Sequence, residues 1–597
     1  MACLAFGALA LVGLLGVQGR AASGTVAGKA VPAAAATDAQ SSSYLPVVVV
    51  GFPPTGTLAG IVRDANGPIG GATVRVQATT RVTESDGEGR FSLTELAAGQ
   101  PVTLTAWAPG YYIGGGQAYL PGCDDVELTL TAHATEDDSS YQWLSAFAAA
   151  GEAANCQNCH ADAANPASTL PFDEWVTDAH AGTTQNVRFL TMYNGTDVYG
   201  NQSPLTRYVC PPDYGCFPLP PDPNQPYYGP GYKLDFPATA GNCAACHAPV
   251  AAIDAPYSTD PNAVAGVGGE GVACDFCHKV WDVRLDPATG LPYANASGTL
   301  SYVFRRPPQG HQFFAGPLDD VAPGEDTYSP LQSQSQFCAP CHYGAFWDTL
   351  VYNSYGEWLA SPYSDAGSGQ TCQDCHMPPR GTAHFALADR GGLKRDPATI
   401  YSHRMPGASD ESLLQNAVDM RATARLEGDR IAVRVDITND RTGHHVPTDS
   451  PLRQLILLVQ ATDEGGRPLA QLSGPTVPAW AGVGTAAQGY YAGLPGKGFA
   501  KVLQELWTNV SPTGAYWNRT RVLSDNRLAA FASDISSYGF AAPTEGTATV
   551  EITLIYRRAF IELMDQKGWD VRDIVMAETR MIVESRTHFL VSCQNMT

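Results

Sequence analysis

Five copies of the motif Cys-x-x-Cys-His carry most of the chemistry available to this chain of 597 residues. Two thiols separated by two residues can form thioether bonds with the two vinyl groups of one haem, and the imidazole of the next residue can then bind the haem iron. The motifs therefore predict five covalently bound c-type haems. The cysteines that would carry them are Cys156, Cys159, Cys243, Cys246, Cys274, Cys277, Cys338, Cys341, Cys372 and Cys375, and the proximal iron ligands would be His160, His247, His278, His342 and His376.

Zinc binding and thioredoxin-like redox chemistry are the alternative uses of a Cys-x-x-Cys pair. Zinc knuckles require no histidine directly after the second cysteine, and a redox Cys-x-x-Cys motif normally occurs once in a chain. Histidine follows all five pairs here. The pattern therefore favours haem over both alternatives.

Eight histidines lie outside the five motifs, enough to supply a distal ligand to every iron. A haem with two axial histidines is low-spin and suits electron transfer, because both axial positions are filled. We interpret His133 and His588, which lie beside predicted β-domains, as structural residues. The candidate distal ligands are His180, His311, His384, His403, His444 and His445.

The remaining cysteines are consistent with an oxidising compartment. Cys3 falls in an apolar N-terminal run, which leaves four further cysteines. Cys210 and Cys216 flank the turn sequence PPDYG and are predicted to form a disulfide. A pairing of Cys123 with Cys593 is a second hypothesis, since a sequence does not define disulfide connectivity.

The composition excludes some partners and suggests a destination. Lys and Arg total 36 against 58 Asp and Glu, so the formal net charge is −22 and nucleic acid is not an expected partner. Residues 1–23 include an apolar run and small residues typical of a signal peptide, and residues 24–54 resemble a flexible linker. No later segment is predicted to span a membrane. We expect an exported protein, periplasmic or on the cell surface, whose partners are redox proteins or other cytochromes.

The sequence divides into three zones with different residue patterns, so the predicted fold is multidomain. Residues 55–133 alternate apolar and polar side chains between Asn-Gly, Gly-Gly and Asp-Gly turns, a pattern that predicts an N-terminal β-sandwich. Residues 136–411 hold all five motifs in a loop-rich region with short helices, where haem would replace a side-chain core. Residues 412–597 return to strand-like periodicity and predict a mostly-β C-terminal sandwich.

The stretches GIVRDANG and SDGEGRFSL resemble the carboxypeptidase regulatory-like domain, which implies a spacer or docking module without catalysis. The stretches GNCAACHAP, EGVACDFCHKV, QFCAPCH, YGEWLASPY, CQDCHMP, SHRMPG and TGHHVPT together resemble multihaem c-type cytochromes related to tetrahaem electron carriers and, more distantly, to hydroxylamine oxidoreductase. This second resemblance implies distal ligation by His180, by His403 and by one of His444 and His445. It gives weaker support to His311 and His384.

An exported pentahaem electron carrier, with no catalytic residue assigned, is therefore the predicted function. The first alternative is an oxidoreductase with one open haem iron that acts on a small nitrogen or sulfur compound. The similar segments DEWVTDAH and GEWLASPY place Tyr363 opposite His180, where a ligand could have been replaced, although no Cys-x-x-Cys-Lys motif of ammonia-forming nitrite reductases occurs. The second alternative is self-assembly as a subunit of an extracellular cytochrome filament. Short connections also predict that haems two and three, and haems four and five, form close pairs.

Overall fold

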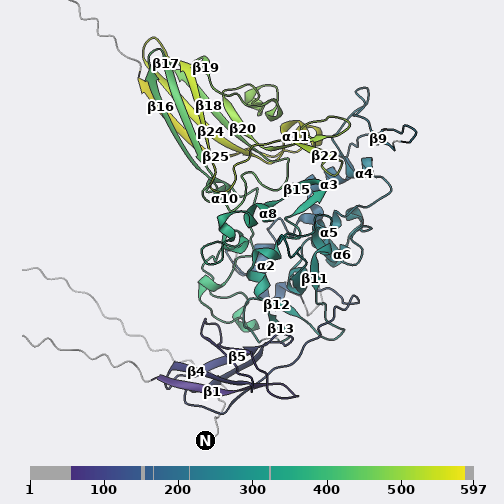
Figure 1. Cartoon of the computed structure of the whole chain (residues 1–597), viewed down its shortest axis with the longest axis vertical. Helices are drawn as coiled ribbons and strands as arrows, with labels where there is room; N and C mark the ends of the chain where they lie inside the picture. Colours follow the sequence, from purple (N-terminus) through teal and green to yellow (C-terminus); the bar gives the residue numbers. More distant parts are fainter. Residues whose placement is uncertain (1–54, 149–154, 166, 214, 322–323, 585–597) are drawn as a thin grey trace, which may run out of the picture. The chain divides into compact units, whose positions relative to one another are not determined.

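The structure is a computed structural model that describes residues 55–148, 155–165, 167–213, 215–321 and 324–584. The chain forms two compact units, the first ending at Ala132 and the second beginning at His133 (Figure 1). The predicted signal peptide (1–23), the predicted linker (24–54), Cys593 and His588 lie outside the described residues. Within the described ranges, every helix is too short or too polar to cross a membrane.

The first unit is the predicted N-terminal β-sandwich. Its two sheets have the strand orders β4-β1-β7 and β3-β2-β5-β6. Leu58 and Val62 of β1 and Leu104 of β5 are fully buried in the shared core, as expected for inward-facing positions of alternating strands. The strands are β1 (Thr55–Arg63), β2 (Thr73–Val76), β3 (Val82–Glu84), β4 (Arg90–Ala97), β5 (Val102–Trp107), β6 (Gly114–Tyr119) and β7 (Val126–Thr129).

Gly60 explains why the GIVRD segment begins with glycine. Strand β1 pairs with β7 in parallel, with Gly60 opposite Val126. A Cβ atom at residue 60 would lie 1.9 Å from the carbonyl oxygen of Val126. Only glycine allows the two backbones to approach this closely.

The C-terminal part of the second unit is also a β-sandwich, drawn in green to yellow in Figure 1. Its sheets have the strand orders β16-β17-β23-β19 and β20-β18-β24-β25 and enclose one apolar core. The core contains Ile431 and Val435 of β17 and Leu455 of β18, all fully buried. The strands of these sheets are β16 (Asp419–Glu427), β17 (Arg430–Thr438), β18 (Gln454–Asp463), β19 (Gln471–Ser473), β20 (Gly496–Phe499), β23 (Ser533–Ala541), β24 (Thr547–Arg557) and β25 (Ile574–Glu584), while β21 (Lys501–Glu505) and β22 (Thr520–Asp525) form a separate two-stranded sheet.

The motif-bearing part of the second unit consists of short helices, short strands and loops (Figure 1). The first, second, third and fifth motifs each end in a short helix that includes the motif histidine. The fourth motif instead directly follows a 3₁₀ helix. Helices of four to six residues are not stable alone, so contacts outside each helix must hold it. The motif helices are α1 (Gln157–His160), α5 (Ala244–His247), α7 (Cys274–Lys279), η6 (Ser335–Phe337) and α9 (Cys372–His376).

Other short elements connect these helices. The remaining α-helices are α2 (Pro171–Trp175), α3 (Val187–Asn194), α4 (Tyr232–Asp235), α6 (Pro249–Ala252), α8 (Ser354–Leu359), α10 (Glu411–Gln415) and α11 (Ile561–Lys567). The remaining 3₁₀ helices are η1 (Thr183–Gln185), η2 (Pro261–Ala263), η3 (Gly266–Gly269), η4 (Gly298–Leu300), η5 (Pro330–Ser333), η7 (Pro362–Ser364), η8 (Ala388–Arg390), η9 (Pro397–Thr399), η10 (Ala479–Ala481) and η11 (Ala486–Gln488). The two-stranded pairings join β8 (Tyr208–Val209) to β9 (Phe217–Pro218), β10 (Val280–Val283) to β11 (Tyr302–Phe304), β12 (Phe314–Gly316) to β13 (Asp326–Tyr328), and β14 (Gly344–Phe346) to β15 (Thr349–Tyr352).

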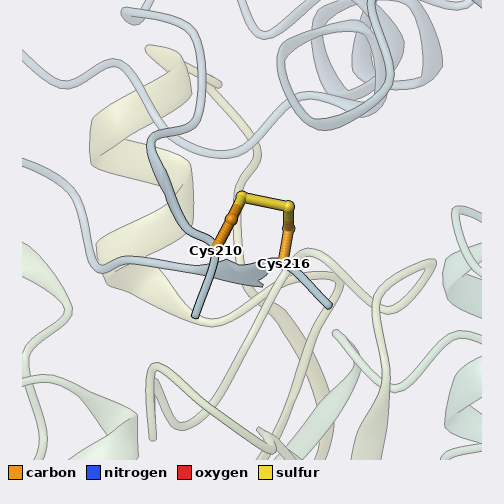
Figure 2. Close-up of a disulfide and its surroundings, with 2 residues drawn as sticks. All are labelled: Cys210 and Cys216. Atoms are coloured by element: carbon orange, nitrogen blue, oxygen red, sulfur yellow. A yellow bond between two sulfur atoms is a disulfide. The ribbon is translucent and has the colours of Figure 1, made fainter. Parts of the chain in front are cut away.

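A disulfide joins Cys210 to Cys216, as predicted (Figure 2). The bridge closes the loop between β8 and β9, and its Cα atoms lie 4.0 Å apart. Cys123 is also disulfide-bonded. The hypothesis that pairs it with Cys593 falls on a residue outside the described ranges.

Residues 136–411 and 412–584, which the sequence suggests as separate domains, lie in one compact unit. Buried polar contacts join the two parts. Lys567 of α11 donates to backbone carbonyls near α3, and Arg527 pairs with Glu357 of α8 at 2.8 Å. The C-terminal part therefore also helps to hold the motif-bearing region in place.

Candidate functional site

All five motifs line one cavity of about 1340 Å³ in the second unit. The lining includes each of the ten motif cysteines and each of the five motif histidines. The ten cysteines are free thiols, partly buried and partly open to the cavity. The fold thus brings five motifs that span about 220 residues of sequence around one shared space.

Thiols from different motifs contact one another inside this cavity. The thiols of Cys156 and Cys274, of Cys246 and Cys341, and of Cys338 and Cys372 lie close enough to interact electrostatically. The last contact brings the fourth and fifth motifs together, as their short connection predicts. The other two contacts join the third motif to the first and the second motif to the fourth. Sequence separation therefore does not decide which motifs are neighbours.

Three motif histidines are oriented by backbone carbonyls. His160 Nδ1 lies 2.8 Å from the carbonyl oxygen of Phe385, His278 Nδ1 lies 2.8 Å from that of Ala315, and His376 Nδ1 lies 2.7 Å from that of Pro406. A carbonyl only accepts hydrogen bonds, so Nδ1 must carry the proton in each ring. Nε2 therefore keeps its lone pair, which is the usual arrangement of a metal-ligating histidine.

Carboxylates orient two further histidines of the cavity. His342 Nδ1 lies 3.3 Å from Asp449 Oδ2, and His180 Nδ1 lies 2.6 Å from Asp178 Oδ1. Burial opposes ionisation of Asp449, but the hydrogen bond with His342 and the charges of His342 and Arg453 hold the pKa of that carboxyl at about 2. Asp178 lies two residues before His180 in DEWVTDAH, whereas nothing in the sequence near Asp449 marks its role.

Two pairs of imidazoles have the spacing of two axial ligands on one metal. The ring centroids of His180 and His342 lie 6.3 Å apart, and those of His376 and His444 also lie 6.3 Å apart. A metal–nitrogen bond is about 2 Å long and a ring nitrogen lies about 1 Å from the imidazole centre, so ligands on opposite sides of one metal have centroids about 6 Å apart. The two pairs match this separation.

His403 lies close to two motif histidines. Burial, together with repulsion from His278 and then from His160, lowers the pKa of His403 to about 4. The ring lines the cavity, and its Nδ1 is buried without a hydrogen-bond partner. His403 therefore lies near the histidines of the first and third motifs, where it is a candidate distal ligand for either.

His247 of the second motif has a different neighbour. Its ring stacks on Phe189 of α3, with centroids 3.8 Å apart and planes inclined by 5°. Its Nδ1 is buried without a hydrogen-bond partner, and burial alone lowers the pKa of His247 to about 4. Among the described residues, no other histidine makes a ring contact with His247.

The remaining candidate distal ligands have other environments. His311 has a side chain 60% exposed that contacts Glu325, and neither it nor His384 lines the cavity. His445 lines the cavity, but its Nδ1 lies 3.5 Å from buried Glu357. Of the six candidates, the cavity therefore brings together His180, His403, His444 and His445. His133, interpreted from the sequence as structural, is buried against Trp281 and Phe313.

Two buried glutamates hold the segments that supply these distal candidates. Glu174 Oε2 accepts the backbone N–H of His403 at 2.7 Å, and Glu357 Oε2 accepts that of His445 at 3.1 Å. Each carboxylate also pairs with one arginine at 2.8 Å, namely Arg380 or Arg527. Sequence reasoning missed this role, although the shared Glu-Trp pair of DEWVTDAH and GEWLASPY could have indicated it.

The tryptophans of the same two segments make matching contacts. Trp175 Nε1 donates to the carbonyl of Val272 at 2.9 Å, and Trp358 Nε1 donates to that of Gln370 at 2.8 Å. Each acceptor lies two residues before a motif cysteine. The internal similarity in the sequence therefore corresponds to a repeated structural unit.

Tyr363 occupies the position of His180 in the second copy of this unit. The N–H of Gln370 donates to the carbonyl of Tyr363, just as the N–H of Val272 donates to that of His180. The Tyr363 hydroxyl donates to the carbonyl of Asp440 at 2.9 Å, and the ring stacks on Phe531. Both the hydroxyl and the ring of Tyr363 therefore have partners within the chain.

These residues fit covalently attached haem better than zinc. A structural zinc site gathers four ligands around one point. Within the described ranges, no three side chains of His, Cys, Asp or Glu converge closely enough to hold a metal ion by themselves. The motif thiols instead line a cavity beside imidazoles whose Nε2 atoms are free to bind, as haem attachment requires.

The comparisons with known proteins concern both units. Residues 57–131 match the carboxypeptidase regulatory-like domain family. No curated protein matches the chain. A penta-heme cytochrome c552 from Thermochromatium tepidum is a similar solved structure, with a TM-score of 0.47, 19% identity, and coverage of 72% of this chain and 97% of that chain. A PapD-like domain of human CEP192 has a TM-score of 0.13 and 9% identity, covering 29% of this chain and 87% of that chain. Residues 57–131 of the first unit are therefore similar to carboxypeptidase regulatory-like domains.

Proposed function

We propose that this protein is an exported five-haem c-type cytochrome that carries electrons outside the cytoplasm. The proposal is carried by one observation: five Cys-x-x-Cys-His motifs line a single cavity in which two motif histidines each have the ring centroid of a second imidazole at 6.3 Å. An apolar N-terminal run and the disulfide between Cys210 and Cys216 support export, because disulfides persist in oxidising compartments.

Each residue type has a defined role in this proposal. The ten motif cysteines hold five haems covalently, and the five motif histidines bind the irons from one side. His180 would be the second histidine ligand of the fourth haem, His444 that of the fifth, and His403 that of the first or third. A bound haem supplies an iron that gains and loses one electron. Electrostatic interaction between thiols of the fourth and fifth motifs, and of the second and fourth, supports a chain of neighbouring haems.

The haem count tests the proposal directly. A pyridine haemochrome assay on the purified full chain, expressed with cytochrome c maturation, should give five covalent haems per chain. Two or fewer haems would contradict the proposal. Replacement of both cysteines of one motif by Ala should lower the count by one, while Cys210→Ala with Cys216→Ala should leave it at five.

A second function is favoured by the surroundings of His247. Among the described residues, no imidazole has a ring contact with His247 as His180 has with His342, so the iron of the second haem is a candidate for an open position where a small nitrogen or sulfur compound reacts. Electron paramagnetic resonance of the oxidised protein separates the two functions. Low-spin signals alone indicate an electron carrier, whereas a high-spin signal that nitrite or hydroxylamine shifts indicates an oxidoreductase.

A further inference from the structure

Three arginines from distant parts of the sequence line the same cavity. Arg188 belongs to α3 and precedes Phe189, the residue that stacks on His247. Arg453 directly precedes β18, and Arg558 directly follows β24. Gln454 pairs with Arg557 across β18 and β24, so Arg453 and Arg558 lie at the adjacent ends of these two strands, and Arg188 interacts electrostatically with both. We call these three residues the arginine cluster.

The arginine cluster has no carboxylate partner among the described residues. Arg453 Nη1 donates to the carbonyl of Thr448 at 3.0 Å, and Arg558 Nε is buried without a hydrogen-bond partner. Burial, with repulsion from Arg558 and Arg453, lowers the pKa of Arg188 to about 10. The carboxylate of Asp449 lies nearby but is hydrogen-bonded to His342.

Other buried arginines of this chain are neutralised by carboxylates. Four of them form ion pairs of 2.8 Å or less with Asp or Glu: Arg306, Arg395, Arg527 and Arg557. The arginine cluster, whose residues are partly buried, differs from these four in forming no ion pair among the described residues; Arg305 also forms none, but it lies over the ring of Trp281. Asp449 compensates Arg453 in part, but the charges of Arg188 and Arg558 lie beside an apolar cavity without such a carboxylate and are costly unless an anion neutralises them.

The chemistry of the guanidinium group defines the expected ligand. A guanidinium presents parallel N–H donors that match two oxygen atoms of one planar anion. Tyr556 is buried, lines the same cavity and interacts electrostatically with all three arginines, so its hydroxyl is an additional donor. The site thus offers several donors and a net positive charge in a confined space.

We propose that Arg188, Arg453 and Arg558 form a binding site for a small anion with two or more oxygen atoms. This inference rests on the proposed function, since the cavity is the one that the haems would fill. Two sources have the required chemistry. One is a propionate carboxylate of a haem held by the second or fourth motif, and the other is a free oxyanion such as sulfite or nitrite that enters from solvent.

The experiment uses the full-length haem-loaded protein and single substitutions in the arginine cluster. Arg188→Gln and Arg558→Gln each remove one charge, and Arg188→Lys keeps the charge while losing the paired N–H donors. Arg453 is left intact because it also donates to Thr448. Arg441→Gln is the matched control, because Arg441 lines the same cavity but is exposed and 3.9 Å from Asp440. The haem count of every variant is measured first.

Two readouts distinguish the sources of the anion. If a free oxyanion binds, calorimetry with sulfite or nitrite should give saturable binding to the wild type that Arg188→Gln and Arg558→Gln each weaken at least about tenfold. If a propionate occupies the site, added anions should not bind, but one midpoint potential should fall in both Gln variants, because loss of a nearby positive charge stabilises the ferric state. In either case Arg188→Lys should have the smaller effect and Arg441→Gln none.

The inference is wrong if five haems are present and neither anion binding nor any midpoint potential depends on the arginine cluster. If the wild type lacks the haems, the proposed function fails instead. In that case, calorimetry with sulfite and nitrite still tests whether the arginine cluster binds an anion, because binding should weaken in Arg188→Gln and Arg558→Gln.

Discussion

His342 Nδ1 lies 3.3 Å from the carboxylate of Asp449, and its ring faces that of His180, whose own Nδ1 lies 2.6 Å from Asp178. Both imidazoles of this pair are therefore backed by a carboxylate. In the other pair, His376 and His444 are backed by backbone carbonyls. A carboxylate partner increases the electron density of an imidazole ligand, and such hydrogen bonds tune the reduction potential of a bound metal.

We expect Asp449→Asn to raise the midpoint potential of the fourth haem. The amide keeps a hydrogen-bond acceptor but removes a negative charge that stabilises ferric iron. Spectroelectrochemical titration should show one of five potentials rising, and Asp178→Asn should raise the same one. Asp463→Asn, on the exposed end of β18, is the control and should change none. Unchanged potentials in both variants, at a full haem count, would contradict the assignment.

His444, rather than His445, is expected to bind the fifth iron. The ring of His444 lies 6.3 Å from that of His376, whereas His445 lies beside Glu357. His444→Ala should therefore produce a new high-spin ferric signal in electron paramagnetic resonance. His445→Ala should leave the low-spin spectrum unchanged. The opposite result would exchange the two roles.

Lys567 is expected to stabilise the contact between the two parts of the second unit. Its side chain is fully buried, and Nζ donates to the carbonyls of Thr191, Thr196 and Pro230. Lys567→Met should lower the free energy of unfolding by about 3 kcal/mol, because three buried carbonyls lose their donor. Urea unfolding of the full chain measures the change. Lys394→Met, at an exposed position, should have little effect.

Asp326 should make the stability of the protein depend on pH. Burial and then repulsion from Asp320 raise the pKa of Asp326 to about 8; Lys279 opposes this shift and Glu325 adds to it. The folded chain therefore holds a proton that the unfolded chain releases above its ordinary pKa of 3.8. The stabilisation is complete below that value and is lost as pH rises through about 8.

The test compares urea unfolding at about pH 5 and about pH 9. The wild type should lose more stability between these two pH values than Asp326→Asn, which keeps the shape of the side chain but cannot ionise. An equal loss in both proteins would show that Asp326 does not titrate in this range.

Local sequence patterns were sufficient to predict both sandwiches. The alternation in LAGIVRD and RIAVRVDITN has a period of two, and each inward residue becomes a core residue of β1 or β17. This works because the side chains of a strand alternate between its two faces wherever the strand lies. The disulfide between Cys210 and Cys216 was predictable for a similar reason, since only a short turn separates its cysteines.

The sequence by itself also determined the five candidate haem-attachment sites, because all the groups that attach one haem lie within five consecutive residues. Only the tertiary structure decided which further residues lie beside each attachment site. It brings His180 to His342, Asp449 to His342, and His444 to His376, and it gathers the arginine cluster from three distant segments. Such partners are separated by tens to hundreds of residues and belong to loops, short helices and strand ends that no shared local pattern connects. Their positions therefore depend on the packing of the whole second unit rather than on any local pattern.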